Sequence, residues 1–402
     1  MSKKRILFVP QTLRNKQILL LYAKALLKDF DVFFLRTRLL GVNSNIGDDT
    51  GDTGIQLLTP EFLMRDIPDG ARLYRRMIIQ KSLHQKFKDY LSDLNLSLVI
   101  TGVDDDGMGQ WATCLAKENS IATLTCQEGL RLFKFKFPFE VKFKYHLNNL
   151  ISGLFYPPAK IRSLYSTADY AAVWGEYDKK IALANGKNDI NVYIVGNPRD
   201  LTNAQHINRP IGSPFKILFL DFPSTSFPKN TFNLSQFSVF RQELLEVTKS
   251  LGCRLIYKTH PFIRKDELAF VRKQVSSYSH VELVEEGIAE DLLSRSDVCL
   301  TLPSTAVASI LISGLPFIQV YPFMKGFRKL LWDPVIKYGA GVSIDDLQDL
   351  SGALNKIKEP VWQNSYQKAS KIAAEEVFGP LDGKASDRFA AVVKKILSEN
   401  KS

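Results

Sequence analysis

Short runs of apolar, often β-branched residues alternate with longer segments of helical period along the whole sequence. This alternation constrains the fold most, because parallel strands have to be joined by crossovers that are usually helical. In the first half the predicted strands are Arg5–Val9, Asp31–Leu35, Leu96–Thr101, Ala122–Thr125, Ala171–Val173 and Val192–Val195. Helical spacing predicts helices over Ile18–Lys28 and Leu73–Leu94. The first half therefore predicts an α/β domain.

The same pattern starts again after a linker. Gly196–Asp200, with its Asn-Pro step, and the polar stretch that follows are typical of turns and linkers. The predicted strands of the second half are Lys216–Asp221, Arg254–Tyr257, Val281–Val284, Val298–Leu302 and Pro316–Tyr321. The predicted helices are Phe237–Ser250, Asp266–Ser277, Ala289–Ser294, Ala306–Ser313, Ser365–Val377 and Ala385–Glu399.

The length of 402 residues exceeds what one hydrophobic core usually serves. We therefore predict two Rossmann-like α/β domains, over residues 1–205 and 206–378, facing a central cleft that receives the carboxyl ends of both sets of strands. A C-terminal helix within 379–402 is expected to pack back on the first domain.

Composition and charge narrow the class of protein. The sequence is 45% hydrophobic and 24% charged, and its longest apolar run, Ile310–Val320, is broken by Gly314 and Pro316. That run is well short of the ~20 residues that span a bilayer. No signal-peptide core follows the N-terminus, and the four cysteines are scattered without a CxxC pair. We expect a cytoplasmic protein with reduced cysteines, no cofactor and no metal site.

The net charge of +11 predicts an anionic partner. The candidates are a nucleotide donor, an acidic glycan or glycolipid, and an anionic membrane surface, which would place the protein peripherally on the inner face of the cell membrane. We expect no nucleic acid, because the sequence has no helix-turn-helix spacing, finger spacing or RNA-binding aromatic signature.

Two polar turns in the second half predict a phosphate site. Lys258, His260 and Pro261 follow a strand, and a histidine or lysine there can stabilise a departing nucleotide phosphate. Ser304 and Thr305 lie between a strand and a helix, where hydroxyls and free backbone N–H groups bind phosphate. The alternatives are ordinary ones: a histidine that satisfies a loop, and hydroxyls that only cap a helix.

Carboxylates follow two strands of the first half. Glu128 lies on a glycine turn after Ala122–Thr125, where it could act as a general base, although it could equally pair with Arg131. Clustered aspartates at 104–106 could bind a metal or share a proton, but the absence of an EF-hand pattern and the Asp-Gly turn favour a structural or acceptor-positioning role. Asp105 is kept as a second candidate for the base.

The segment 132–145 alternates aromatic and basic residues, with phenylalanines on one parity and lysines on the other. A hairpin that covers the domain core is the ordinary interpretation of the aromatics. The basic face is a candidate surface for an acceptor or an anionic membrane. It comprises Arg131, Lys134, Lys136, Lys142 and Lys144.

Taken in order, these motifs resemble the GT-B superfamily of nucleotide-sugar enzymes. Ala168–Tyr177 followed by Val195–Arg199 looks like the end of the first domain in bacterial surface-polysaccharide proteins of this superfamily. Lys258–Pro261 and Ser304-Thr305 resemble the "HP" and "ST" donor-binding motifs of bacterial sialyltransferases and Kdo transferases. Gln127-Glu128-Gly129 resembles the acidic-acidic-glycine motif that supplies the general base in these transferases.

Two departures from related patterns bear on the reaction. Ser309 stands where many UDP-sugar enzymes of this superfamily carry a ribose-binding glutamate. The pattern Glu-Ala-Gly-Leu-Arg of UDP-N-acetylglucosamine 2-epimerases is matched only partly, and aligning the glycines puts Gln127 where the epimerase carboxylate should be. Both departures point away from the epimerase.

The resemblance implies an inverting, metal-independent glycosyltransferase that uses a CMP-activated acidic sugar, such as sialic acid or Kdo, and a hydroxyl of a bacterial lipopolysaccharide or capsule. Glu128 would deprotonate the acceptor, while His260, Lys258, Ser304 and Thr305 would stabilise the leaving phosphate. An epimerase-like enzyme, a CDP-polyol phosphotransferase and a non-catalytic protein that binds glycans or membranes are the alternatives.

Overall fold

The structure is a computed structural model, and its chain forms two compact units. The described residues are 3–10, 13–36, 54–63, 73–102, 104, 107–129, 165–199, 214–222, 234–260, 263–287, 289–302, 306–320, 335–336 and 338–399. Among these residues, the first unit contains those up to Arg199 and those from Phe378 onward, and the second unit contains those from Pro214 to Val377.

The first unit is built on a 7-stranded sheet in the order β3-β2-β1-β4-β5-β6-β7, with every neighbouring pair parallel. The strands are β1 (Lys4–Val9), β2 (Phe30–Leu35), β3 (Gln56–Leu58), β4 (Leu98–Thr101), β5 (Ala122–Cys126), β6 (Tyr170–Val173) and β7 (Val192–Ile194). The helices are α1 (Leu13–Leu26), α2 (Leu73–Asp93), α3 (Gly107–Glu118), α5 (Glu176–Ala184) and α14 (Ala385–Glu399), and short 3₁₀ turns span Glu61–Leu63 and Asp189–Asn191.

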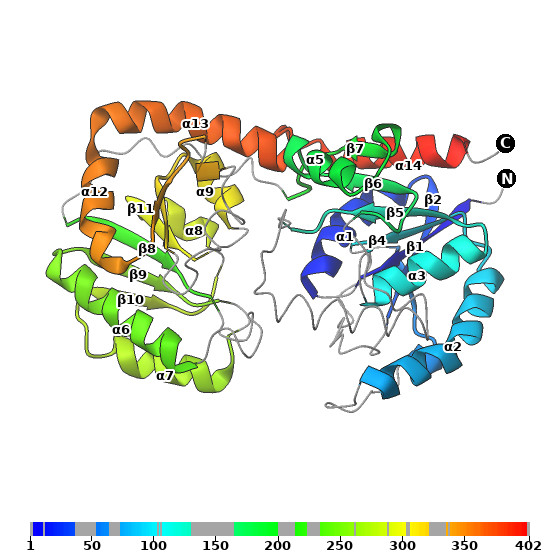
Figure 1. The fold of residues 1–402 in the computed structure, drawn as a ribbon, viewed down its shortest axis with the longest axis horizontal. Helices are drawn as coiled ribbons and strands as arrows, with labels where there is room; N and C mark the ends of the chain where they lie inside the picture. The colour runs from blue at the N-terminus through cyan, green and yellow to red at the C-terminus, as the bar shows by residue number, and fades with distance from the viewer. Residues whose placement is uncertain are drawn as a thin grey trace. The chain divides into compact units, whose positions relative to one another are not determined.

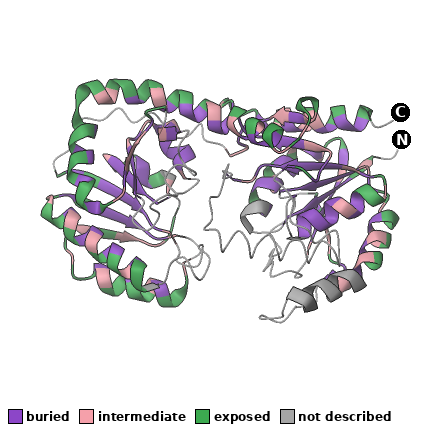
Figure 2. Ribbon diagram, in the orientation of Figure 1, coloured by how far each residue is buried: buried purple, intermediate pink, exposed green. Residues whose placement is uncertain are grey.

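Helices cover both faces of this sheet (Figure 1). Leu7 and Val9 of β1 belong to a core with buried residues of α2 and α3. Alternate strand residues point to the opposite face, so Ile6 and Phe8 lie against the other layer. That face is covered by α1, which contacts α14. A sheet buried on both faces explains the nearly continuous apolar strands of this sequence, which appear as buried ribbons in Figure 2.

The second unit is built on a 6-stranded parallel sheet in the order β10-β9-β8-β11-β12-β13. The strands are β8 (Lys216–Leu220), β9 (Arg254–Lys258), β10 (Val281–Val284), β11 (Val298–Thr301), β12 (Phe317–Val320) and β13 (Val342–Ile344). The helices are α6 (Leu234–Ser250), α7 (Lys265–Val275), α8 (Glu290–Leu293), α9 (Val307–Ser313), α12 (Leu350–Lys358) and α13 (Pro360–Phe378), and a 3₁₀ turn spans Leu347–Asp349.

In both sheets the strand that comes first in sequence lies in the interior, and the strand order reverses beside it. The first strand β1 lies between β2 and β4, and β8 lies between β9 and β11. Ligands of open α/β sheets bind outside the carboxyl ends of the strands at such a reversal. The architecture therefore predicts that ligands bind near the residues that follow β8, β9 and β11, and near those that follow β1, β4 and β5.

The chain re-enters the first unit at a tightly packed junction. The amide of Asn197 donates to the carbonyl of Phe378 over 2.9 Å. Gly379 has a φ of +77°, and a Cβ built there would lie 1.9 Å from the carbonyl oxygen of Trp174. Only glycine fits this position. Beyond it, the ring of Phe389 in α14 stacks on Tyr22 of α1 with centroids 4.1 Å apart.

No helix in the described part of the chain is long and apolar enough to cross a membrane.

Candidate functional site

The carboxyl ends of β9 and β11 lie on either side of β8. Leu220 at the end of β8 is in register with Lys258 on one side and with Thr301 on the other. Adjacent strands are ~4.8 Å apart, so these two strand ends are separated by roughly 10 Å along one edge of the sheet. The turns predicted to bind phosphate continue from these ends. His260 is described, whereas Pro261, Ser304 and Thr305 lie outside the described residues.

His260 is half-buried, directly after β9. Its ring lies 5.9 Å from the ring of Phe222, centroid to centroid, with the two planes tilted by 51°. Its carbonyl accepts a hydrogen bond of 3.0 Å from the amide of Ile263, which closes the turn into α7. Because Phe222 follows β8, the ring contact joins the ends of the neighbouring strands β8 and β9.

Lys258 has a different environment from the one its position in the motif predicts. Its side chain is buried, with the residue only 4% exposed, and its ammonium donates to the carbonyls of Thr259 at 3.2 Å and Glu285 at 3.0 Å. Glu285 follows β10, so the ammonium lies on the side of β9 that faces away from β8. Burial lowers the pKa of Lys258, and the nearby Glu285 and Glu286 oppose that effect. In this structure Lys258 joins two strand ends.

A buried ion cluster under this edge was not anticipated from the sequence. Asp221, the residue after β8, accepts from Nη2 of Arg241 over 2.9 Å, and the same nitrogen donates to Oε1 of Glu267 over 2.7 Å. Burial raises the pKa of Asp221, although Arg241 opposes that shift. Charged residues on helices usually face water. Nothing in the sequence spacing indicates that Arg241 of α6 and Glu267 of α7 point into the interior.

At the corresponding edge of the first unit, Gln127 has a structural role. It is fully buried, and its side-chain oxygen accepts from the amide of Trp174 over 2.6 Å. Its side-chain nitrogen donates to the carbonyl of Gly129 at 3.1 Å and to Oδ2 of Asp178 at 2.7 Å. Glu128, the next residue, is half-buried at the end of β5. The pattern Gln-Glu-Gly therefore places a fixed amide beside a partly accessible carboxylate.

The aspartate cluster after β4 contributes a turn anchor. Asp104 is fully buried and accepts hydrogen bonds from the amides of Tyr165, Thr167 and Ala168 at 2.8 to 3.0 Å. Burial raises its pKa, and these three amides oppose the shift. Asp105, the reserve candidate for the base, lies outside the described residues. Within the described part of the chain, no group of three or more acidic, histidine or cysteine side chains could hold a metal ion.

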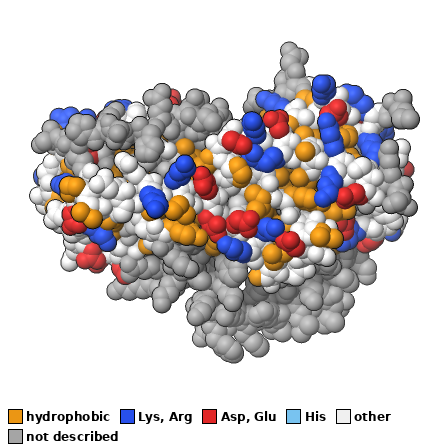
Figure 3. Space-filling model, turned by 90° about the horizontal axis from the view of Figure 1, so that it is seen from above, with side chains coloured by type: hydrophobic (Ala, Val, Ile, Leu, Met, Phe, Trp, Pro, Cys, Tyr) orange, Lys and Arg blue, Asp and Glu red, His pale blue; other side chains and the backbone are white. Residues whose placement is uncertain are grey.

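The proposed basic surface, Arg131, Lys134, Lys136, Lys142 and Lys144, also lies outside the described residues. On the face that Figure 3 shows, the basic and acidic side chains of the described residues are intermixed. Ion pairs among the described residues include Lys394 with Asp29 at 2.7 Å and Arg388 with Asp382 at 2.9 Å. This part of the surface offers mixed charge to a partner.

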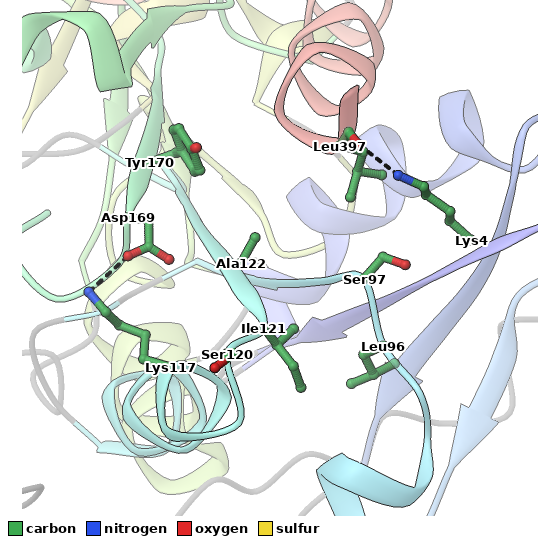
Figure 4. Close-up of a pocket in the computed structure, with 10 residues that line it drawn as sticks. All are labelled: Lys4, Leu96, Ser97, Lys117, Ser120, Ile121, Ala122, Asp169, Tyr170 and Leu397. Atoms are coloured by element: carbon green, nitrogen blue, oxygen red, sulfur yellow. Dashed lines mark hydrogen bonds and ion pairs between the residues drawn. The ribbon is translucent and has the colours of Figure 1, made fainter. Parts of the chain in front are cut away.

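A pocket of about 470 Å³ lies at the opposite, amino edge of the first sheet (Figure 4). It is lined by residues that begin or precede β1, β4, β5 and β6 and by the end of α14: Lys4, Leu96, Ser97, Lys117, Ser120, Ile121, Ala122, Asp169, Tyr170 and Leu397. Lys4 donates to the carbonyl of Leu397 over 2.6 Å, and Lys117 pairs with Asp169 over 2.9 Å. None of the predicted site residues that the structure describes lines this pocket.

Two parallel α/β Rossmann-like domains of this kind define the GT-B fold, and solved structures support this assignment. One is a Listeria monocytogenes protein to which UDP-N-acetylglucosamine 2-epimerase activity is assigned by name only. It matches this chain with a TM-score of 0.63 and 16% identity, with 99% of this chain and 98% of that chain covered. The UDP-GlcNAc 2-epimerase from Neisseria meningitidis, bound to UDP-GlcNAc, gives 0.58 and 14%, with 98% and 100% covered. A glycosyltransferase from Rickettsia africae gives 0.58 and 11%, with 99% of each chain covered.

At these identities the similarity shows the GT-B fold, which the sequence motifs had predicted. No protein-family model matches the sequence, and no curated protein matches it either.

Proposed function

We propose that this chain is a nucleotide-sugar-dependent glycosyltransferase whose second domain binds the donor nucleotide at the carboxyl edge around β8. One observation carries the proposal. His260 follows β9 at the point where the strand order reverses, and the strand that precedes Ser304 and Thr305 ends on the other side of β8. Polar turns on both sides of a strand reversal are where α/β proteins bind nucleotides. Solved GT-B neighbours bound to UDP or a UDP-sugar support the same class of ligand.

The proposed donor is a CMP-activated acidic sugar, and a UDP-sugar is the alternative. Support for the first comes from α9, where Ser309 replaces the ribose-binding glutamate of the UDP-sugar pattern and is buried in the helix. The sequence of this helix, VASILIS, contains no carboxylate at all. A ribose bound as in that pattern would therefore lack its acidic partner.

Transfer to an acceptor is favoured over epimerisation by the state of Gln127. The epimerase pattern requires a carboxylate at this position, but the amide is fully buried and bonded through both its oxygen and its nitrogen. An amide cannot take up a proton as a carboxylate does. Glu128 is half-buried and remains the candidate base of the first domain.

In the proposed reaction, Glu128 takes the proton of an acceptor hydroxyl on a glycan or glycolipid. The acceptor oxygen forms a bond to the anomeric carbon as the bond from that carbon to the phosphate oxygen breaks, with inversion. The electron pair of that bond leaves with the nucleotide. His260 donates a hydrogen bond to the phosphate, and this contact strengthens as negative charge develops there.

The decisive experiment supplies CMP-, CDP- and UDP-activated donors with a mixture of oligosaccharide acceptors and identifies the nucleotide that is released. Release of CMP that depends on an acceptor is the expected result. Acceptor-independent release of UDP with free N-acetylmannosamine would instead establish the epimerase, and transfer of a polyol phosphate would establish the phosphotransferase.

The same assay tests the two candidate side chains. Glu128→Ala should lower turnover by ~10²–10⁴-fold, the usual contribution of a general base. His260→Ala should lower it by roughly 10²–10³-fold, as loss of a charge-stabilising donor does. His84→Ala and Glu118→Ala are matched controls, because these side chains pair with each other on the surface of the first unit at 3.3 Å. Full turnover in both site variants would refute the assignment.

A further inference from the structure

The buried ion cluster of the second unit joins two carboxylates to a single guanidinium. Two carboxylates, Asp221 and Glu267, share one nitrogen of Arg241, and all three side chains are at most 2% exposed. Such clusters are weak contributors to stability, because desolvation offsets the attraction, and apolar replacements are often as stable. A role in positioning neighbouring residues is therefore a better explanation for this arginine than a contribution to stability.

The first carboxylate of the cluster leads to His260 through a short path. The amide of Asp221 donates to the carbonyl of Lys258 over 3.0 Å, which fixes the end of β8 against the end of β9. Its second oxygen, Oδ1, accepts from the amide of Phe222 over 2.8 Å. The ring of Phe222 then meets the ring of His260 at 5.9 Å. Asp221 thus holds the backbone of the residue whose aromatic ring contacts the histidine.

The second carboxylate holds the other side of the same turn. The carbonyl of His260 accepts a hydrogen bond from the amide of Ile263, two residues before α7. Glu267 lies in the first turn of this helix and bonds to Arg241 over 2.7 Å. One guanidinium therefore connects the end of β8 with the first turn of α7.

Arg241 itself is held in a single orientation. Its guanidinium carbon lies 5.5 Å from the centroid of the Phe237 ring, one turn earlier in α6, at cation–π distance. Among the described residues, its buried Nε and Nη1 have no hydrogen-bond partner. Arginine keeps a planar, rigid arrangement of donors that lysine cannot reproduce, so the geometry of both ion pairs depends on this residue type.

We infer that Arg241 is a positioning residue that fixes the ring of His260 at the donor site through Asp221, Phe222 and Glu267. This inference rests on the proposed function only where it concerns turnover. The placement of the ring is a property of the protein without ligand and can be measured there.

The test observes His260 directly by NMR of protein labelled with ¹³C at its histidines, of which the chain has five. His260→Gln assigns the resonance. Arg241→Lys keeps the positive charge and should shift or broaden the His260 signal in the absence of nucleotide. Arg295→Lys is the matched control, because Arg295 pairs with Glu282 on the surface of the same unit, with both side chains 49% exposed, and it should leave the signal unchanged.

Phe222→Leu provides an independent second variant that leaves the ion cluster intact. It removes the ring contact, so it should also move the His260 signal. Glu267→Gln keeps the size of that side chain while it weakens the bond to Arg241, and it decides the question if Arg241→Lys does not fold. An unchanged His260 signal in any of these folded variants overturns the inference.

Turnover separates positioning from a general loss of stability. Misplacement of a reacting group by about 1 Å can lower a rate by ~100-fold, so Arg241→Lys should reduce kcat by about that factor with a smaller change in the KM for the donor. If the wild-type protein releases no nucleotide from any donor, the proposed function fails. The NMR result on the ligand-free protein still decides whether Arg241 positions His260.

Discussion

At the level of single residues, glycines at the junction with α14 show how tightly one position can be constrained. Gly379 combines a φ of +77° with a Cβ direction that runs into the carbonyl of Trp174 at 1.9 Å. Gly252 also has a positive φ, +64°, but nothing lies within 4 Å of its Cβ direction. The two positions separate the cost of backbone strain from the cost of a steric clash.

Gly379→Ala is expected to be strongly destabilising. The positive φ alone costs ~1–2 kcal/mol for a residue with a Cβ, and the clash with backbone adds to it because a carbonyl cannot rotate away. Gly252→Ala should lose only the first contribution. Urea unfolding of both variants checks this, and equal losses in the two would mean that the junction relaxes freely.

His280 gives a pH dependence with a definite sign. Burial lowers its pKa below the usual 6.5, and its Nε2 lies 3.0 Å from Oγ1 of Thr248. A histidine with a lowered pKa in the folded protein binds its proton more readily when unfolded, so its contribution falls as the pH drops below about 6.5. His280→Gln should therefore lose less stability than wild type between pH 7.5 and 5.5 in urea titrations. Parallel losses would argue against a lowered pKa.

At the level of elements, long periodic segments were predicted well and very short ones were not. The helix Ala385–Glu399 was predicted with the bounds it has, because its apolar residues recur at helical spacing over several turns. The strands β3 and β13 were missed, since three residues carry too little periodicity to distinguish them from loops. The helix α3 was also missed, because two glycines in its first turn are typical of a loop.

The candidate site was only partly predictable for a related reason. A polar turn directly after a strand, such as Thr259-His260, is visible in the sequence because it is local. The cluster of Asp221, Arg241 and Glu267 joins residues that are 20 and 26 positions apart, and no local pattern marks them as buried. For Lys258, the motif identified the residue but did not predict that its side chain is buried and bonded to the carbonyls of Thr259 and Glu285.

Packing of α14 on α1 should be a main source of stability for the first unit. Phe389 and Tyr22 are both fully buried and stack at 4.1 Å. Phe389→Ala should cost ~3–5 kcal/mol, as loss of a buried aromatic ring does, and should raise hydrogen exchange in α1. Phe270→Ala, at a position 44% exposed in the second unit, should change neither quantity appreciably. Unchanged exchange in α1 would show that the helix docks independently of this ring.

At the level of the whole molecule, the positive charge is unevenly distributed along the chain. The segment 131–164 has seven basic residues and a single acidic one, Glu140. The resulting charge of this segment is more than half of the net charge of +11. An electrostatic partner would be attracted to this segment first, and such attraction weakens as salt screens it.

We therefore expect the protein to float with anionic liposomes at low salt and to be released as salt rises. Replacing Lys134, Lys136, Lys142 and Lys144 with glutamine should abolish flotation. The control variant replaces four exposed lysines with glutamine instead: Lys24, Lys28, Lys368 and Lys371. It has the same total charge as the first variant and should still float with the liposomes. Equal loss in both variants would indicate a response to net charge alone.

The hydrogen bond between Asn197 and Phe378 has a consequence for engineering of the chain. The polypeptide leaves the first unit and returns to it at two points whose backbone atoms are 2.9 Å apart. The second unit is thus topologically an insert within the first, which serves as its host domain. A bridge of a few residues across that gap should yield a freestanding host, and its folding after excision of the insert would show which half is the autonomous module.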